Sequence, residues 1–133
     1  MKKIATLFLI LALTGCVSRA DADKNLARGC SAAVELFMDE YFKIKTLKSV
    51  KFKPSSEFGA GYRVVMLFAV VSDGWLDVDK EYECVFTEEM GAMNASHRAN
   101  LYQIKADGKT YGMNKATPLQ KKLNETVQRA MGQ

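Results

Sequence analysis

The spacing of apolar residues predicts a helix near each end of the chain. The first helix begins at Asp21 or Asp23, and six apolar residues recur on one face at intervals of three and four: Leu26, Cys30, Ala33, Val34, Phe37 and Tyr41. The second has a clear start, with Thr117 as N-cap, Pro118 at the first helical position and Gln120 at the third. Its predicted apolar face consists of Leu119, Leu123, Val127 and Ala130.

Between these helices, alternation of period two predicts antiparallel strands. Val50 and Phe52 alternate with lysines, and Pro54 ends that strand. The most apolar run, 64–71, is expected to form the second strand, and Asp73-Gly74 is a signal for a two-residue hairpin turn. On the returning strand one face carries Tyr82, Cys84 and Phe86, and the other carries Asp79, Glu81 and Glu83.

The pattern continues with a predicted loop from Glu88 to His97 and a fourth strand at 101–106. Asp107-Gly108 is a second turn signal, and a short fifth strand is expected at 109–111. The whole order predicts an α+β two-layer sandwich, with the N- and C-terminal helices packed on one face of a four- to five-stranded antiparallel sheet.

The first sixteen residues have the pattern of an export signal. Lys2 and Lys3 precede the uncharged run 4–13, which is too short to span a bilayer. The following Leu13-Thr14-Gly15-Cys16 resembles the lipobox of bacterial lipoproteins. The resemblance implies cleavage after Gly15 and a diacylglycerol on Cys16. An ordinary signal peptide with an unmodified cysteine is the alternative.

The lipobox also implies where the protein is located and how its domain is bounded. Val17, rather than Asp, follows the cysteine, which in this family is similar to sorting to the outer membrane, facing the periplasm. We therefore expect a signal peptide at 1–15, a lipidated tether at 16–22 and a single domain at 23–133. The 118 residues left after cleavage suffice for one core.

Charge argues against a nucleic-acid partner. Without Lys2 and Lys3, the chain retains 17 basic and 15 acidic residues, a net charge of only +2. The run from Tyr62 through Tyr82-Glu83-Cys84 to Asp107-Gly108 resembles a pattern in small exported bacterial domains of unknown role. That resemblance implies no activity.

With Cys16 assigned to lipid, Cys30 and Cys84 remain. Both lie on predicted core-facing surfaces, and exported proteins mature in an oxidising compartment, so the two are expected to form a disulfide. Two buried free thiols are the alternative. A redox-active pair is disfavoured, because the chain has no Cys-x-x-Cys motif.

Nothing in the sequence indicates catalysis or a cofactor. His97 is the only histidine, and no Gly-x-Ser-x-Gly, phosphate-binding or dinucleotide motif occurs. The acidic row of Asp77, Asp79, Glu81 and Glu83 is typical of a solvated strand face. One loop combines Met90, Met93 and His97, the soft ligands that suit Cu(I). Methionines also fill gaps beneath loops without any metal.

A lysine strip follows the first predicted helix and continues through the first predicted strand: Lys43, Lys45, Lys48, Lys51 and Lys53. About five residues separate Cys16 from the predicted helix, a reach of roughly 20 Å, so these lysines are candidates for contact with anionic headgroups. Lysines also protect a sheet edge from unwanted pairing. We favour that second interpretation.

The run 64–71 is apolar on both faces, although the helices cover only one. If Asp73 and Gly74 form the turn, paired residue numbers add to 147 and Val65 opposes Tyr82. The outer face then carries an apolar stripe beside an acidic one, which would suit a protein partner. The candidate partner-binding residues are Val64, Met66, Phe68, Asp79, Glu81 and Glu83.

Together these patterns predict a lipid-anchored periplasmic binding or accessory protein of the bacterial cell envelope. We expect it to engage a protein partner and to catalyse no reaction. The alternative is a small ligand-binding module, for Cu(I) or a small apolar molecule. A purely structural lipoprotein is a third possibility.

Overall fold

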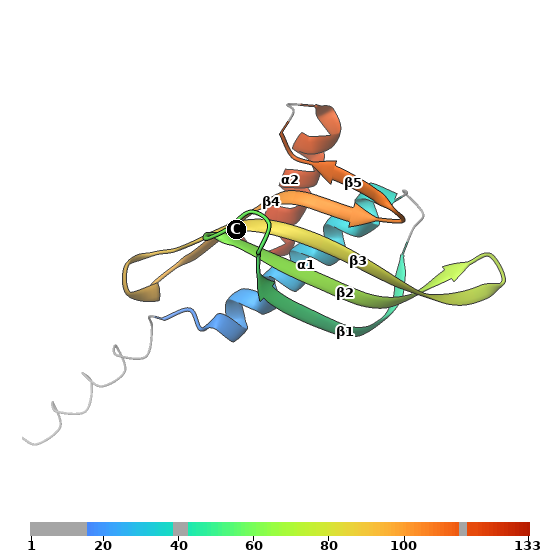
Figure 1. The fold of residues 1–133 in the computed structure, drawn as a ribbon, viewed down its shortest axis with the longest axis horizontal. Coiled ribbons are helices and arrows are strands. Elements are labelled where there is room, and N and C mark those ends of the chain that lie inside the picture. The colour runs from blue at the N-terminus through green and yellow to red at the C-terminus, as the bar shows by residue number, and fades with distance from the viewer. Residues whose placement is uncertain (1–15, 39–42, 115–116) are drawn as a thin grey trace, which may run out of the picture.

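In the computed structural model, which describes residues 16–38, 43–114 and 117–133, two helices pack against a five-stranded antiparallel sheet (Figure 1). This confirms the predicted α+β two-layer fold. The strands are hydrogen-bonded in chain order, β1-β2-β3-β4-β5. The elements are α1 (Arg19–Met38), β1 (Ile44–Pro54), β2 (Tyr62–Asp73), β3 (Leu76–Met90), the 3-10 turn η2 (Ala92–Asn94), β4 (His97–Ala106), β5 (Lys109–Gly112) and α2 (Pro118–Ala130).

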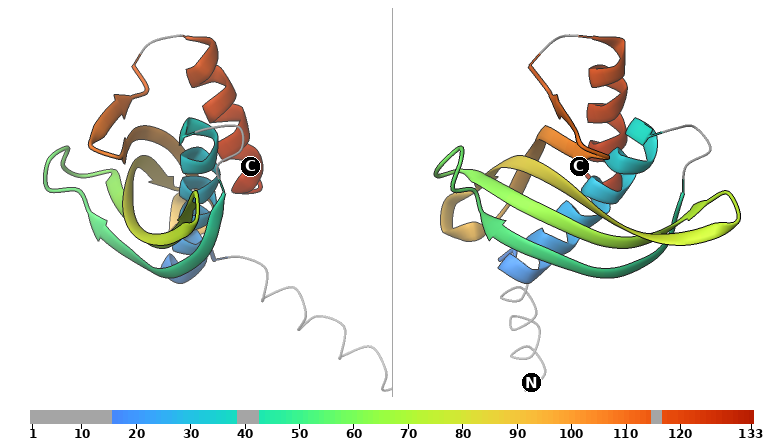
Figure 2. Two further views of the ribbon diagram at one scale, coloured as in Figure 1. Left: turned by 90° about the vertical axis from the view of Figure 1, so that its right-hand side faces the viewer. Right: turned by 45° about the vertical axis from the view of Figure 1, so that its right-hand side comes forward.

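The core lies between the helices and the sheet face that they share (Figure 2). Strand residues that alternate along β2, β3 and β4 point into it, as period two requires. The buried side chains include Leu26, Val34, Val65, Leu67, Tyr82, Phe86, Ile104, Leu123 and Val127. The predicted helix and strand faces therefore form one core.

A disulfide joins Cys30 of α1 to Cys84 of β3, with the Cα atoms 5.7 Å apart. Both residues are fully buried. The predicted pairing is confirmed, and it ties the first helix covalently to a central strand across 54 positions of sequence.

The predicted start of α2 is also confirmed. The Thr117 hydroxyl accepts a hydrogen bond of 3.2 Å from the Gln120 backbone N–H, and Pro118 occupies the first turn. The predicted apolar face is wrong at Leu119, which is exposed. Gln120 is buried instead, and its amide nitrogen donates to the Gly112 carbonyl at 3.0 Å. That hydrogen bond satisfies a polar group that the hydrophobic pattern excluded from the core.

The first helix begins earlier than predicted. Its cap is Ser18, whose hydroxyl accepts from the Asp21 backbone N–H at 3.1 Å, rather than Asp21 or Asp23. Two residues, and not five, therefore separate Cys16 from the helix. The Val17 N–H also donates to the Asn94 carbonyl at 2.8 Å. Tyr41, predicted on the helix face, lies outside the described residues.

Strands β3 and β4 extend into the segment predicted as a loop. β3 continues to Met90 and β4 begins at His97, so only residues 91–96 connect them. β1 similarly begins at Ile44, before the alternating stretch that predicted it. Charged residues in these extensions form ion pairs, among them Glu88 with Arg19 and Lys45 with Asp77.

The predicted register of the β2–β3 hairpin is wrong by two residues. The turn consists of Gly74 and Trp75, and Val65 opposes Cys84 rather than Tyr82. Gly74 has a φ of +64°, as the first central position of a type II′ turn requires. This register pairs Val64 with Val85 instead of Glu83, a better cross-strand match. The faces are unchanged, because a shift of two preserves the alternation.

Candidate interaction site

The β2–β3 hairpin extends past the described residues of β1 (Figure 1), and the side chains at its turn are apolar and exposed. Ile44 of β1 pairs with Val71, so among the described strands the last rungs of the hairpin have no further neighbour. Trp75 is fully exposed and Leu76 is 70% exposed. We call these two residues the hairpin tip.

The hairpin tip was not among the residues predicted from sequence. The Asp73-Gly74 signal predicted a polar turn at this position. The candidate partner-binding residues were predicted farther along the same two strands. One sequence feature does point to the tip. The only tryptophan of the chain directly follows that turn signal, where polar residues are usual.

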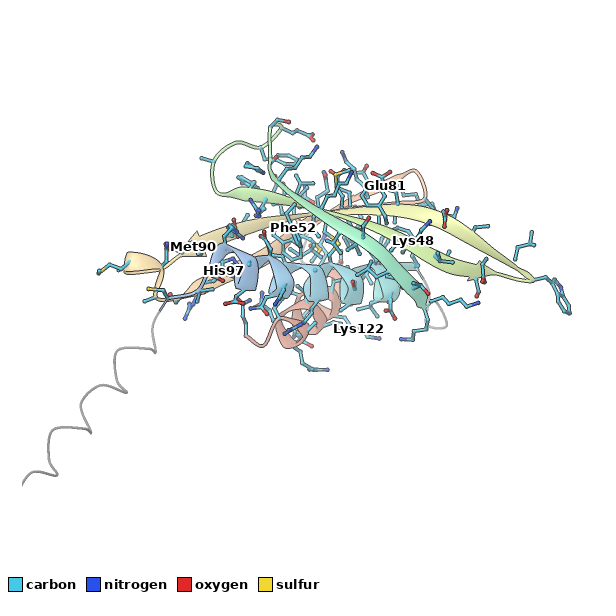
Figure 3. The ribbon with its side chains drawn as sticks, turned by 90° about the horizontal axis from the view of Figure 1, so that it is seen from below. Lys48, Phe52, Glu81, Met90, His97 and Lys122 are labelled. Atoms are coloured by element: carbon cyan, nitrogen blue, oxygen red, sulfur yellow. A yellow bond between two sulfur atoms is a disulfide. The ribbon has the colours of Figure 1, made fainter. Side chains whose placement is uncertain are left out.

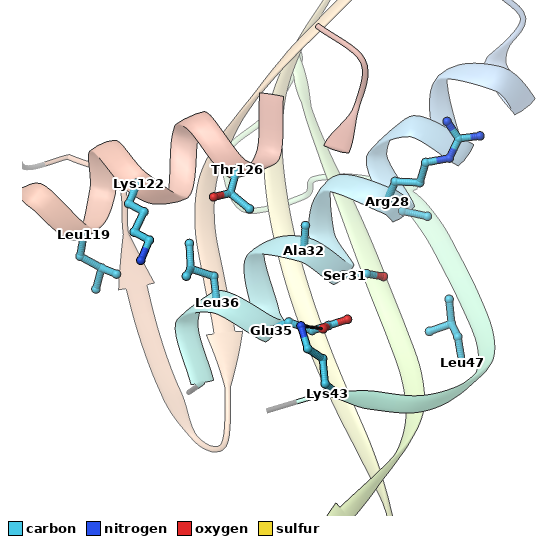
Figure 4. A pocket seen from close by; sticks show the side chains of 11 residues that line it. Arg28, Ser31, Ala32, Glu35, Leu36, Lys43, Leu47, Leu119, Lys122 and Thr126 are labelled. Carbon is cyan, nitrogen blue, oxygen red and sulfur yellow. Dashed lines mark ion pairs between the residues drawn. The ribbon is translucent and has the colours of Figure 1, made fainter. Parts of the chain in front are cut away.

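On the opposite side of the molecule from the outer sheet face, α1, α2 and the start of β1 enclose an open groove of about 910 Å³ (Figure 4). Its apolar lining includes Leu36, Leu47 and Leu119. Leu47 and Leu119 are among the few large apolar side chains left exposed in the described part of the chain. We call this hollow the helix groove.

Basic residues surround the helix groove. Arg28 of α1, Lys43 before β1 and Lys122 of α2 contribute cationic groups from three sides (Figure 4). Among the described residues, Glu35 is the single acidic one in the lining, and it pairs with Lys43 at 3.1 Å. The groove therefore combines an apolar floor with a net positive rim.

The predicted partner-binding stripe lies on the outer face of the sheet, but it is less open than expected. Val64 is buried, and Met66 and Phe68 are half-buried. Lys51 of β1 lies over the Phe68 ring, with its Nζ atom 5.3 Å from the ring centroid. With the corrected register, Phe68 opposes Glu81 and Met66 opposes Glu83.

The lysine strip belongs mainly to β1, an edge strand with two bulges. The extra residues at the bulges are Lys45 and Lys48, and each reaches across β2 to a carboxylate of β3. Lys45 pairs with Asp77 at 2.7 Å, and Lys48 pairs with Asp79 at 3.3 Å. Bulges and lysines are devices that protect a sheet edge, so this geometry favours edge protection over membrane contact.

The residues of the predicted copper loop are only partly brought together. Met90 and His97 are direct cross-strand partners near the start of α1 (Figure 3). Met93 instead is 92% exposed, beside Cys16, whose thiol sulfur lies 3.7 Å from the Met93 carbonyl oxygen. The His97 Nε2 atom is already hydrogen-bonded to Glu88 at 2.8 Å. Copper binding stays a prediction, and it would have to displace that hydrogen bond.

Charged side chains join the start of α1 to strands β2, β3 and β4. Arg63 contacts both oxygens of Asp23, at 2.8 and 2.9 Å. Arg19 pairs with Asp23 at 2.8 Å and contacts both oxygens of Glu88, at 2.6 and 2.8 Å. Glu88 also binds His97. Each bidentate pair fixes geometry as well as charge, so the network fastens the helix to the sheet.

The pKa of Glu88 shows which effect dominates in this network. Burial raises that pKa, but hydrogen bonds from Arg19 and His97 outweigh burial, and the pKa of Glu88 is lowered from its ordinary value. The Glu88 hydrogen bond in turn raises the pKa of Arg19. Glu88 is therefore held as a carboxylate, which suits a structural anchor more than a proton carrier.

Comparison of the chain with protein-family models, with curated protein sequences and with solved structures finds no match. Within the described residues, no helix is both long and apolar enough to cross a membrane. No group of three His, Cys, Asp or Glu side chains in that part of the chain is arranged to hold a metal ion.

Proposed function

We propose that this chain is a lipid-anchored accessory protein of the bacterial cell envelope, which binds a protein partner through its hairpin tip and catalyses no reaction. The observation that carries the proposal is the complete exposure of Trp75 at the end of a projecting hairpin, with Leu76 beside it. Tryptophan is strongly enriched among the residues that dominate protein–protein binding energies.

The position of the tip favours a protein over the bilayer that would hold the anchor. The hairpin turn and the start of α1 lie at opposite ends of the molecule (Figure 3). The tip is followed by exposed Asp77 and Asp79 on β3, and acidic residues disfavour contact with an anionic lipid surface. A partner in the periplasmic space fits both observations.

The proposed anchor is compatible with the structure at Cys16. Its side chain is exposed, and only Val17 and Ser18 separate it from α1. Palmitate labelling in cells should mark the wild type and should be lost in Cys16→Ser. Equal labelling of both forms would remove the anchor from the proposal.

The tip is tested by site-specific photo-crosslinking in the membrane-anchored protein. A photoreactive amino acid at position 75 should give protein adducts, whereas the same group at position 109, an exposed site on β5, should not. Leu76→Ala should lower the yield of adducts. Loss of a central contact residue reduces the binding free energy by about 1 kcal/mol or more, which lowers the affinity several-fold. Lys80→Ala, on the same hairpin, is the matched control. Absence of adducts at position 75 would contradict the proposal.

A further inference from the structure

We infer that the partner of the hairpin tip is a second copy of this chain, whose helix groove receives Trp75 and Leu76. The inference rests on the proposed function, because it names the partner of the same tip. The hairpin tip and the helix groove, both in the described part of the molecule, are complementary in size and in charge.

The shapes match in scale. An aromatic side chain buries roughly 150–250 Å² when it is enclosed, and binding pockets commonly measure about 300–1,000 Å³. The groove, at about 910 Å³, therefore has room for a tryptophan and a leucine together. Its exposed Leu47 and Leu119 would be covered by the same contact.

The charges match as well. Residues 72–81, which form the outer part of the hairpin, include four acidic residues and one lysine. Lys45 and Lys48 offset two of these carboxylates through ion pairs, so the outer part of the hairpin keeps a net negative charge. The described lining of the groove has Arg28, Lys43 and Lys122 as basic residues and Glu35 as its acidic one. Opposite potentials favour this pairing and disfavour tip against tip or groove against groove.

The two features are separate on one molecule. Lys122, on the rim of the groove, lies in the helix layer well away from the hairpin turn (Figure 3). The contact joins two different surfaces, so a copy can offer its tip to one neighbour and its groove to another. A tip of one tryptophan, which buries roughly 150–250 Å², and one leucine covers less than the roughly 800 Å² per partner of a stable interface. Association in solution is consequently weak, and attachment to a shared bilayer strengthens it by raising the effective concentration.

The single tryptophan makes this contact directly measurable. The lipidated protein is reconstituted into phosphatidylcholine vesicles at increasing ratios of protein to lipid, and the emission of Trp75 is recorded. The emission should shift to shorter wavelength as surface density rises, because the indole leaves water. In the double variant Leu47→Glu, Lys122→Glu, the protein-to-lipid ratio at which half of the emission shift is reached should increase at least tenfold. Lys121→Glu, a matched charge reversal on the same helix outside the groove, should behave as wild type.

A mixing experiment separates the tip from the groove. The Leu47→Glu, Lys122→Glu protein keeps its tip, and Trp75→Ala keeps its groove. Addition of Trp75→Ala, which contributes no tryptophan, should restore the emission shift of the groove variant, provided that melting curves show both variants folded. Failure of this rescue between folded variants would overturn the inference.

Three other results would also overturn it. A shift that is independent of density and survives the groove substitutions would assign the tip to the bilayer. Absence of any shift, together with adducts from position 75 whose mass is not that of two copies, would leave the proposed function intact with a different partner. Absence of the emission shift and of all adducts from position 75 would contradict both the inference and the proposed function.

Discussion

The side-chain amide of Gln133 pairs with the backbone of Ala99 as a neighbouring strand would. Its oxygen accepts from the Ala99 N–H at 3.1 Å, and its nitrogen donates to the Ala99 carbonyl at 3.1 Å. Ala99 lies on the part of β4 that β5 does not reach, because β5 pairs only with residues 103–106. Gln133 therefore closes a short open edge of the sheet, a place where unpaired backbone groups invite association.

Gln133→Ala should uncover this edge. Hydrogen exchange of the Ala99 amide should accelerate by about an order of magnitude, which corresponds to the loss of roughly 1 kcal/mol of local protection. Gln128→Ala is the comparison, because Gln128 makes no hydrogen bond to the Ala99 N–H. Its amide donates to the Ala99 carbonyl at 2.9 Å and to the Asn100 side chain at 3.1 Å, and it accepts from Gln133. Unchanged exchange at Ala99 in Gln133→Ala would contradict this assignment.

The disulfide should contribute strongly to stability. Closing a loop of this length stabilises the folded state by about 4 kcal/mol in the chain-entropy model. Cys30→Ala with Cys84→Ala, or reduction of the wild type, should therefore lower the melting temperature by roughly 10 °C or more. In a Cys16→Ser background, the denatured protein should react with no thiol reagent until a reductant is added. Two reactive thiols before reduction would show that the bridge is absent.

Glu88 should make stability fall in acid. Because its pKa is lowered in the folded protein, its contribution is complete above its ordinary pKa of 4.5 and is lost as the pH falls through the folded value. Glu88→Gln should cost about 1–3 kcal/mol at pH 7. We expect the lower end, because the exposed part of Arg19 is screened by solvent. The difference from wild type should shrink below pH 4.5, as measured by urea unfolding. The matched control is Glu89→Gln, which alters the exposed neighbouring residue. An equal loss of unfolding free energy in Glu89→Gln would contradict the prediction.

Tyr82 should make stability fall in alkali. Burial, with a smaller contribution from the charge of Asp107, raises the pKa of Tyr82 from 10.0 to about 12. Between these values the unfolded chain releases the phenolic proton and the folded protein retains it, so rising pH favours unfolding. The free energy of unfolding should decrease by up to about 1.4 kcal/mol per pH unit from this group. Tyr82→Phe should reduce that slope, and an identical slope in the variant would refute the assignment.

Local periodicity was sufficient to predict the core and the disulfide. Cys30 falls on a helical face and Cys84 on a strand face, and each pattern is strong enough to orient its element alone. Once two amphipathic helices and a one-sided sheet share one core, these cysteines can lie near each other. The start of α2 was predictable for a similar reason, because Thr117 and Pro118 act within a single turn.

The hairpin register was not predictable, because two turns fit the same residues. Gly74 suits the second central position of a type I′ turn and equally the first position of a type II′ turn. The two registers differ by two residues and give the same faces, so the hydrophobic pattern does not separate them. Sequence reasoning consequently placed Asp73 in the turn and missed the exposure of Trp75.

The helix groove and the lysine pairs depend on residues that are distant in sequence. Leu119 lies on the predicted apolar face of its own helix, and Leu47 stands between Lys45 and Lys48 in β1, yet both are exposed in the described fold. Lys45 and Lys48 likewise disturb the alternation of β1. Their role as bulge residues is visible only when their β3 partners are in place.

The disulfide also changes how the chain is connected. The segment between Cys30 and Cys84 contains all of β1 and β2 and the loop at 55–61, so it forms a covalent ring. A protease that cuts that loop therefore opens the ring without dividing the molecule. Both pieces stay joined through sulfur, and each keeps its strand pairing with the rest of the sheet. The nicked protein would migrate as one molecule on a gel run without reductant and as two fragments with it.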